Sequence, residues 1–112
     1  MTNTTHPTFK RPAFTSRVVP VIVITHSDQA VPMAHALLEG GIDVMEITLR
    51  HAAGLPAIDQ VAKHVPQMHV GAGTVTRAQE MQQVKDAGAS FALFRANAAL
   101  ADEGASPLFT QI

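Results

Sequence analysis

Short apolar runs alternate with helical stripes along most of this chain. The first run, residues 18–24, is mostly β-branched, which is typical of a parallel strand buried on both faces. Further runs predict strands at 43–50, 69–75 and 90–94, and the segments after the strands predict helices at about 28–39, 56–65, 76–87 and 96–103. Because successive strands begin roughly 21 to 26 residues apart, about the length of one β/α unit, we expect an α/β fold with a parallel sheet.

Capping signals mark the third predicted helix. Thr76 and Gln79 have the spacing of a capping box, in which each side chain bonds a backbone N–H at the start of the helix. Gly88 is expected to end the same helix in a left-handed turn. The sequence therefore predicts a helix that starts near Thr76 and stops at Gly88.

The second predicted strand carries its charges on one face, because side chains of a strand alternate between faces. The two faces are Met45, Ile47 and Leu49 on one side, and Val44, Glu46, Thr48 and Arg50 on the other. A face with two charges is either solvated, as on an amphipathic edge strand, or functional. Both interpretations are open from this strand alone.

The third predicted strand leads into a glycine-rich turn, Gly71-Ala72-Gly73-Thr74. Glycines between a strand and a helix let a phosphate approach the backbone, so a dinucleotide site is one interpretation. However, Thr76 replaces the third glycine of the G-x-G-x-x-G pattern, and no acidic residue ends a strand about 20 positions later. We therefore favour a tight turn in which the Thr74 hydroxyl and backbone N–H groups bind a small anion.

Arg50 and Thr74 both fall at the carboxyl ends of predicted strands, where parallel barrels place their functional groups. Glu46 lies one layer deeper on the same face as Arg50, with the two backbones about 13 Å apart along the strand. A partly desolvated carboxylate suits proton transfer, and an arginine suits a substrate carboxylate or phosphate. We expect the two side chains to contact different parts of one ligand rather than each other.

Composition narrows the classes of function. A formal charge of −1 gives no basic excess for a nucleic-acid backbone, so nucleic acid is not expected as a partner. Charged residues make up 15% and hydrophobic residues 46%, which favours burial of much surface inside the domain or against other subunits of an oligomer. The chain has no cysteine and no apolar run near the ~20 residues of a membrane helix, so we expect a cytoplasmic protein without a membrane partner.

Five segments together carry a family resemblance. They are residues 18–22, 30–34, 40–41, 46–50 and 70–75. These segments resemble the first half of the 2-keto-3-deoxy-6-phosphogluconate (KDPG) aldolase family, which also acts on 4-hydroxy-2-oxoglutarate. The pairing of E-x-T-L-R with G-A-G-T is the specific part of the resemblance, which continues through residues 87–92.

The resemblance implies a class I aldolase on a (β/α)8 TIM barrel that forms a homotrimer and uses neither a metal nor another cofactor. Such an enzyme splits KDPG, a phosphorylated sugar acid, into the keto acid pyruvate and glyceraldehyde 3-phosphate through a lysine Schiff base. By this resemblance Glu46 would be the general acid/base, moving protons through a water. Arg50, Gly73 and Thr74 would bind the pyruvyl carboxylate.

The chain departs from the family pattern after its fourth predicted strand. Phe94-Arg95-Ala96 stands where the family has a Ser-Pro-Gly turn, and residues 103–112 resemble the family's fifth strand only in part. The family's Schiff-base lysine and its phosphate-binding loops then match no position here, and Lys10, Lys63 and Lys85 are expected at the surface. We expect a truncated half barrel of about four β/α units that lacks aldolase activity alone.

The histidines and the first residues complete the expectations. His26 is the one histidine near the mouth of the expected barrel, and we favour a loop role for it. The histidines show no metal-ligand spacing, so no metal site is expected. Residues 1–17 are expected to form a tail before a partial barrel domain at 18–112.

Two other hypotheses stay open. The first is a non-catalytic half barrel that binds a small anion, such as a keto acid or a phosphate, or pairs with a partner half barrel to cover its open sheet edges. The second is a flavodoxin-like module, for which we expect an open twisted sheet with helices on both faces.

Overall fold

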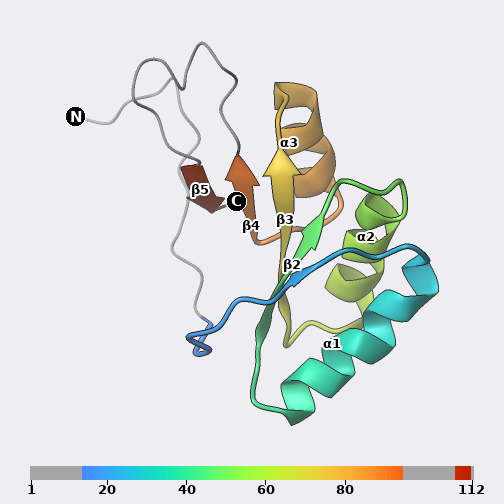
Figure 1. Cartoon of the computed structure of the whole chain (residues 1–112), viewed down its shortest axis with the longest axis vertical. Helices are drawn as coiled ribbons and strands as arrows, with labels where there is room; N and C mark the ends of the chain where they lie inside the picture. The colour runs from blue at the N-terminus through green and yellow to red at the C-terminus, as the bar shows by residue number, and fades with distance from the viewer. Residues whose placement is uncertain (1–13, 95–107, 112) are drawn as a thin grey trace.

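The computed structural model describes residues 14–94 and 108–111, which form one sheet covered by helices (Figure 1). The strands are β1 at Val21–Ile22, β2 at Val44–Thr48, β3 at His69–Val75, β4 at Phe91–Phe94 and β5 at Leu108–Gln111. The helices are the 3-10 helix η1 at Ser27–Gln29 and the α-helices α1 at Ala30–Glu39, α2 at Gly54–His64 and α3 at Ala78–Asp86. The helix predicted at 96–103 lies outside the described residues.

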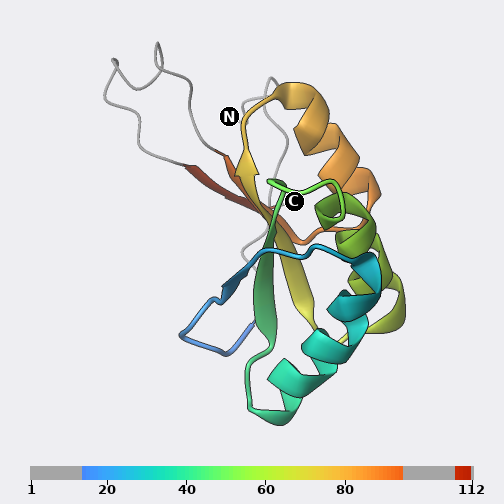
Figure 2. The ribbon, with the colours of Figure 1, turned by 45° about the vertical axis from the view of Figure 1, so that its right-hand side comes forward.

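Strand order in the sheet follows the order of the strands in the chain. The first four strands pair in parallel, whereas β5 runs antiparallel to β4, a pairing that the sequence did not predict. The three α-helices lie on one side of the sheet in both views (Figures 1 and 2). Sequential parallel strands with helices on one side form a barrel wall, so the flavodoxin-like hypothesis, which expects helices on both faces, does not fit.

The hydrophobic core lies between the sheet and the helices. Met45 and Ile47 are fully buried in it and Leu49 is half-buried beside them, so the apolar face of β2 packs under the helices. Ile58 and Val61 of α2 are fully buried against this face. Burial of each such side chain stabilises the fold by about 1.5–3 kcal/mol. Among the helices of the described ranges, none is long and apolar enough to cross a membrane.

The first strand is shorter and more exposed than predicted. The side chains of Val18, Val21 and Val23 are 63%, 63% and 49% exposed, whereas Ile24 is fully buried. β1 lies at one edge of the sheet, and within residues 14–94 the helices cover only one of its faces. The prediction of a strand buried on both faces is therefore wrong, because an apolar run does not show which faces receive a covering layer.

The start of α3 also differs from the prediction. The Glu80 carboxylate accepts hydrogen bonds from the backbone N–H and the hydroxyl of Thr76, at 3.0 and 3.1 Å, and from the N–H of Arg77, at 3.3 Å. The predicted capping box of Thr76 with Gln79 is wrong, because the helix begins two residues later and its third residue is then Glu80. Gly88 follows the helix with a φ of 100°, so its predicted role in ending α3 is confirmed.

Residues just before β1 are attached to the amino-terminal end of the sheet. The Asp43 carboxylate accepts hydrogen bonds from the Thr15 N–H at 2.8 and 3.1 Å, from the Thr15 hydroxyl at 3.2 Å and from the Ser16 N–H at 3.0 Å. These bonds, above all the one from the Thr15 backbone, lower the pKa of Asp43 below its ordinary value. The last part of the expected tail thus contacts the sheet, and residues 1–13 lie outside the described ranges.

Candidate active site

The face of the sheet opposite the helices carries the predicted site residues. Val44, Glu46 and Thr48 point to this face because they alternate along β2 with Met45 and Ile47, which point into the core. Glu46 is only 6% exposed and Thr48 only 4%. Since β2 is also the second of five strands, the interpretation of an edge strand with a solvated face is wrong.

Glu46 lies against a glycine of the neighbouring strand. Strand register pairs Glu46 with Gly71 and Thr48 with Gly73. A Cβ built on Gly73 would collide with Oε2 of Glu46, and a Cβ built on Gly71 would collide with the ring of Phe91. Both glycines therefore leave space for side chains of this same chain. The dinucleotide interpretation fails, because that space is not open to a phosphate.

The glycine segment is part of a strand rather than the predicted turn. β3 continues to Val75, and its pairing with β4 shifts between Ala72 and Val75. Thr74 occupies this bulge with a φ of 61°, in the left-handed region that side chains other than glycine rarely adopt. Such conformations cost of order 1–3 kcal/mol and are concentrated at functional sites. The bulge thus places a strained threonine directly after Gly73.

The environment of Glu46 favours its protonated form. Within residues 14–94, no hydrogen bond or ion pair reaches the carboxylate. Burial alone therefore acts on the group and raises the pKa of Glu46 above its ordinary value of 4.5. A buried carboxyl group with a raised pKa holds its proton more tightly than an exposed one, which suits it to accept and return a proton during a reaction.

Aromatic side chains also lie on this face of the sheet, and Phe91 is level with Glu46 in the strand register. Phe91 is fully buried, and its ring covers Gly71, the register partner of Glu46. The Phe14 ring lies 6.3 Å from the Phe91 ring and 6.1 Å from the His69 ring. The Phe91 ring thus fills the space over Gly71, on the strand next to the one that carries Glu46.

The other predicted residues stand toward the carboxyl ends of the strands. Thr74 is half-buried next to Gly73, and Arg50 is exposed just after β2. Among the described residues Arg50 forms no ion pair with Glu46, in agreement with the expected separation of the two groups. The structure thus brings Glu46, Gly73 and Thr74 together and leaves Arg50 at the rim.

Sequence reasoning assigned no role to Thr48. Its hydroxyl is buried and has no hydrogen-bond partner among the residues that the structure describes. The signal for this residue was present, since Thr48 alternates with Glu46 and therefore shares its face. Only the packing showed that the hydroxyl is removed from water.

The described lysines lie away from this face. Lys63 of α2 forms an exposed ion pair with Asp59 at 3.2 Å, and Lys85 is exposed on α3. Lys10 lies outside the described residues. His26 is exposed after β1, and its backbone N–H lies 3.4 Å from the side-chain oxygen of Gln29. Within the described ranges no three histidine, aspartate or glutamate side chains gather in a way that could hold a metal ion.

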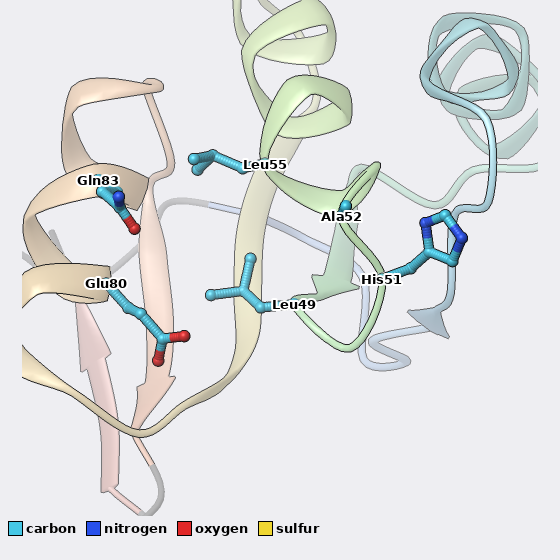
Figure 3. Close-up of a pocket in the computed structure, with 6 residues that line it drawn as sticks. All are labelled: Leu49, His51, Ala52, Leu55, Glu80 and Gln83. Carbon is cyan, nitrogen blue, oxygen red and sulfur yellow. The ribbon is translucent and has the colours of Figure 1, made fainter.

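A hollow of about 210 Å³ opens on the helical side of the sheet. Figure 3 shows Glu80 and Gln83 of α3 on one side of it, facing Leu49 and Leu55. The Glu80 carboxylate already caps α3, and most of the remaining lining is apolar. The hollow contains none of the predicted site residues, and its size is below the ~300–1,000 Å³ of typical ligand pockets.

Known proteins are similar to this chain in both sequence and fold. The model of the family described as KDPG and KHG aldolase matches residues 12–102. A KHG/KDPG aldolase of Escherichia coli (strain K12) is 51% identical over 79 residues. A 2-dehydro-3-deoxy-phosphogluconate aldolase of Dickeya dadantii (strain 3937) is 53% identical over 76 residues.

The structural neighbours agree with the sequence relatives. A crystal structure of KDPG aldolase from Legionella pneumophila, with pyruvate captured as a covalent carbinolamine intermediate, superimposes with a TM-score of 0.67 at 39% identity and covers 70% of this chain and 38% of the neighbour. The KDPG aldolase of Zymomonas mobilis ZM4 with 3-phosphoglycerate gives a TM-score of 0.65 at 38% identity, covering 76% and 43%. The predicted fold class, part of a TIM-barrel wall built from β/α units, is confirmed.

The matches cover most of this chain but a smaller share of each relative. The Escherichia coli match includes 70% of this chain and 37% of the relative, and the Dickeya dadantii match includes 68% and 36%. The chain thus spans little more than a third of the length of these curated relatives. The family model, the relatives and the shared fold show that this chain belongs to the KDPG and KHG aldolase family.

Proposed function

We propose that this chain supplies the proton-transfer and carboxylate-binding part of an aldolase site for KDPG or 4-hydroxy-2-oxoglutarate. The observation that carries this proposal is the position of Glu46. Its carboxyl group is buried, has no partner among the described residues and lies across Gly73, next to the strained Thr74. A structural carboxylate would instead be expected to pair with a cation or with backbone N–H groups.

The proposed chemistry is cleavage of the bond between C3 and C4 of a 2-oxo acid. The electron pair of that bond moves toward C2, the C4 hydroxyl loses a proton to become an aldehyde, and C3 later gains a proton to give pyruvate. A carboxyl group with a raised pKa can accept the first proton and return the second. Glu46 is the described residue that fits this role.

Retro-aldol cleavage of the class I type also needs a lysine that forms an iminium at C2, because the positive nitrogen accepts the electron pair. Lys63 is paired with Asp59 on the surface of α2, and Lys85 is exposed on α3. Neither lies on the face that carries Glu46. We therefore propose that the described residues contribute the acid/base half of the site and not the nucleophile.

Arg50 and Thr74 are proposed to bind the substrate carboxylate. Arg50 follows the carboxyl end of β2, and Thr74 lies near the carboxyl end of the adjacent β3. An arginine can donate two parallel hydrogen bonds to a carboxylate, and a left-handed residue after a glycine can turn its N–H toward the same anion. The carboxylate would then lie at the rim, with the reacting carbons deeper in the site, toward Glu46.

A chimera tests the proposal. Residues 18–94 of this chain would replace the matching segment of the Escherichia coli relative, and pyruvate release from KDPG would be followed with lactate dehydrogenase. We expect activity in the chimera and a loss of kcat of at least about 100-fold in Glu46→Gln. Glu39→Gln, at an exposed glutamate of α1, is the matched control. A folded chimera without activity, or an active Glu46→Gln variant, would refute the proposal.

A second candidate function is favoured by the edge of the sheet. The exposed Val18, Val21 and Val23 leave β1 open to pairing with another half barrel. Sedimentation of the 112-residue chain should then show a dimer that dissociates when Val21 and Val23 are replaced by lysine. A monomer at micromolar concentration would reject this candidate. The homotrimer, the cytoplasmic location and the inactivity of the chain alone stay predictions.

A further inference from the structure

The Thr48 hydroxyl is buried in a way that the fold does not explain. Thr48 is 4% exposed, and no described residue offers its Oγ1 a hydrogen bond. A buried hydroxyl without a partner typically destabilises a protein, and valine has nearly the same shape without that penalty. Of the buried side chains described, only Glu46 and Thr48 are polar, and both are on the same face of β2.

The position of Thr48 relates it to the proposed site. It lies two residues after Glu46 and two before Arg50, so its backbone is about 7 Å along the strand from each. Its register partner is Gly73, the residue against which the Glu46 carboxylate lies. Because Gly73 has no side chain, the Thr48 hydroxyl and the Glu46 carboxylate share one side-chain-free stretch of β3.

We propose that the Thr48 hydroxyl is a substrate-binding group that donates a hydrogen bond to the 2-oxo oxygen of the bound keto acid. This inference rests on the proposed function, since it takes Arg50 as the partner of the substrate carboxylate. In a 2-oxo acid the oxo carbon is bonded directly to the carboxylate carbon. If Arg50 binds the carboxylate at the carboxyl end of β2, the 2-oxo oxygen lies farther into the site. It is then level with Thr48, between Arg50 and Glu46 along the strand.

The test compares stability and binding in the full 112-residue chain. Thr48→Val should melt at a higher temperature than the wild type, because the unpartnered hydroxyl is removed, and should bind pyruvate about tenfold more weakly in an NMR titration. Thr48→Ser keeps the hydroxyl and should restore binding to within about threefold of the wild type. Thr76→Val is the control, because the Thr76 hydroxyl has a hydrogen-bond partner, the Glu80 carboxylate. This variant loses that hydrogen bond and should melt at a lower temperature than the wild type.

Each result decides the inference. A Thr48→Val variant that melts lower than the wild type would show a structural partner for the hydroxyl and would overturn it. Unchanged pyruvate affinity in Thr48→Val, or no binding of pyruvate by the wild type, would overturn it as well. If the Thr48→Val chimera has the same activity and the same KM as the unmutated chimera, the role of Thr48 is refuted and the proposed function stays intact. An inactive wild-type chimera would refute the proposed function, and the pyruvate titration would still decide Thr48.

Discussion

The Glu46 carboxylate lies against the α-carbon of Gly73, in the space that a Cβ would fill. The register partner of Glu46 is Gly71, so Gly73 lies two residues farther along the neighbouring strand. The Glu46 side chain therefore leans across β3 toward the carboxyl ends of the strands. That is the direction in which Arg50 and Thr74 stand, and it connects the buried carboxyl group to the rim of the site.

Gly73→Ala should displace the Glu46 side chain. The new methyl group would occupy the position of the carboxylate, and overpacking of this kind costs about 1–3 kcal/mol. Denaturant unfolding should show this loss, and the chimera should lose kcat as well. Gly40→Ala is the matched control, because a Cβ there meets only ordinary contacts at 3.5 Å or more. Equal stability of Gly73→Ala and the wild type would contradict the packing described here.

The stability of the chain should depend on the protonation of Glu46. Its folded pKa lies above 4.5, so between the two values the folded state binds more protons than the unfolded state. The contribution of Glu46 is thus fully present below pH 4.5 and is lost as the pH rises through the folded pKa. Urea unfolding from pH 4 to 8 should show a growing advantage of Glu46→Gln over the wild type. A constant difference across this range would argue against a raised pKa.

Asp43 should hold residues 14–16 on the sheet only while it is ionised. Its folded pKa lies below 3.8, so its stabilising effect is present above this value and is lost as the pH falls through the folded pKa. NMR amide signals of Thr15 and Ser16 should shift over that acidic range. Asp43→Ala should abolish the shift and leave both amides unprotected at neutral pH, whereas Asp28→Ala should leave them as in the wild type.

Glu80→Ala should destabilise the start of α3. It removes the acceptor of three hydrogen bonds, and loss of a helix cap typically costs about 0.5–2 kcal/mol. Gln79→Ala, at the residue that the sequence pattern favoured, should change the free energy of unfolding by less than about 0.5 kcal/mol. A larger loss of stability in Gln79→Ala than in Glu80→Ala would instead support the capping box of Thr76 with Gln79.

Borohydride reduction in the presence of pyruvate should leave the mass of the 112-residue chain unchanged. The described lysines are exposed on α2 and α3, on the other side of the sheet from Glu46, so neither is placed to attack a keto acid bound at the Glu46 face. Intact mass spectrometry measures the result, with the Escherichia coli relative as the positive control. A pyruvate adduct on any lysine would show that the chain carries its own nucleophile.

Several features follow from the sequence because they depend on neighbours along the chain. Alternation along 43–50 separated the apolar face of β2, which lies in the core, from the face that carries Glu46. The regular spacing of β/α units predicted the parallel strands and, with the E-x-T-L-R and G-A-G-T segments, the family. Glu46 was singled out as a charge on a strand that otherwise reads as buried.

The remaining features depend on residues that are distant in the sequence. Gly73 had the pattern of an anion-binding turn, and only the register of β2 against β3 showed that it makes room for Glu46. The apolar run of β1 could not reveal that its outer face is exposed, and nothing local marked the Thr48 hydroxyl as unpartnered. Periodicity determines which face a side chain points to, whereas the layers packed on that face determine whether it is wet, buried or paired.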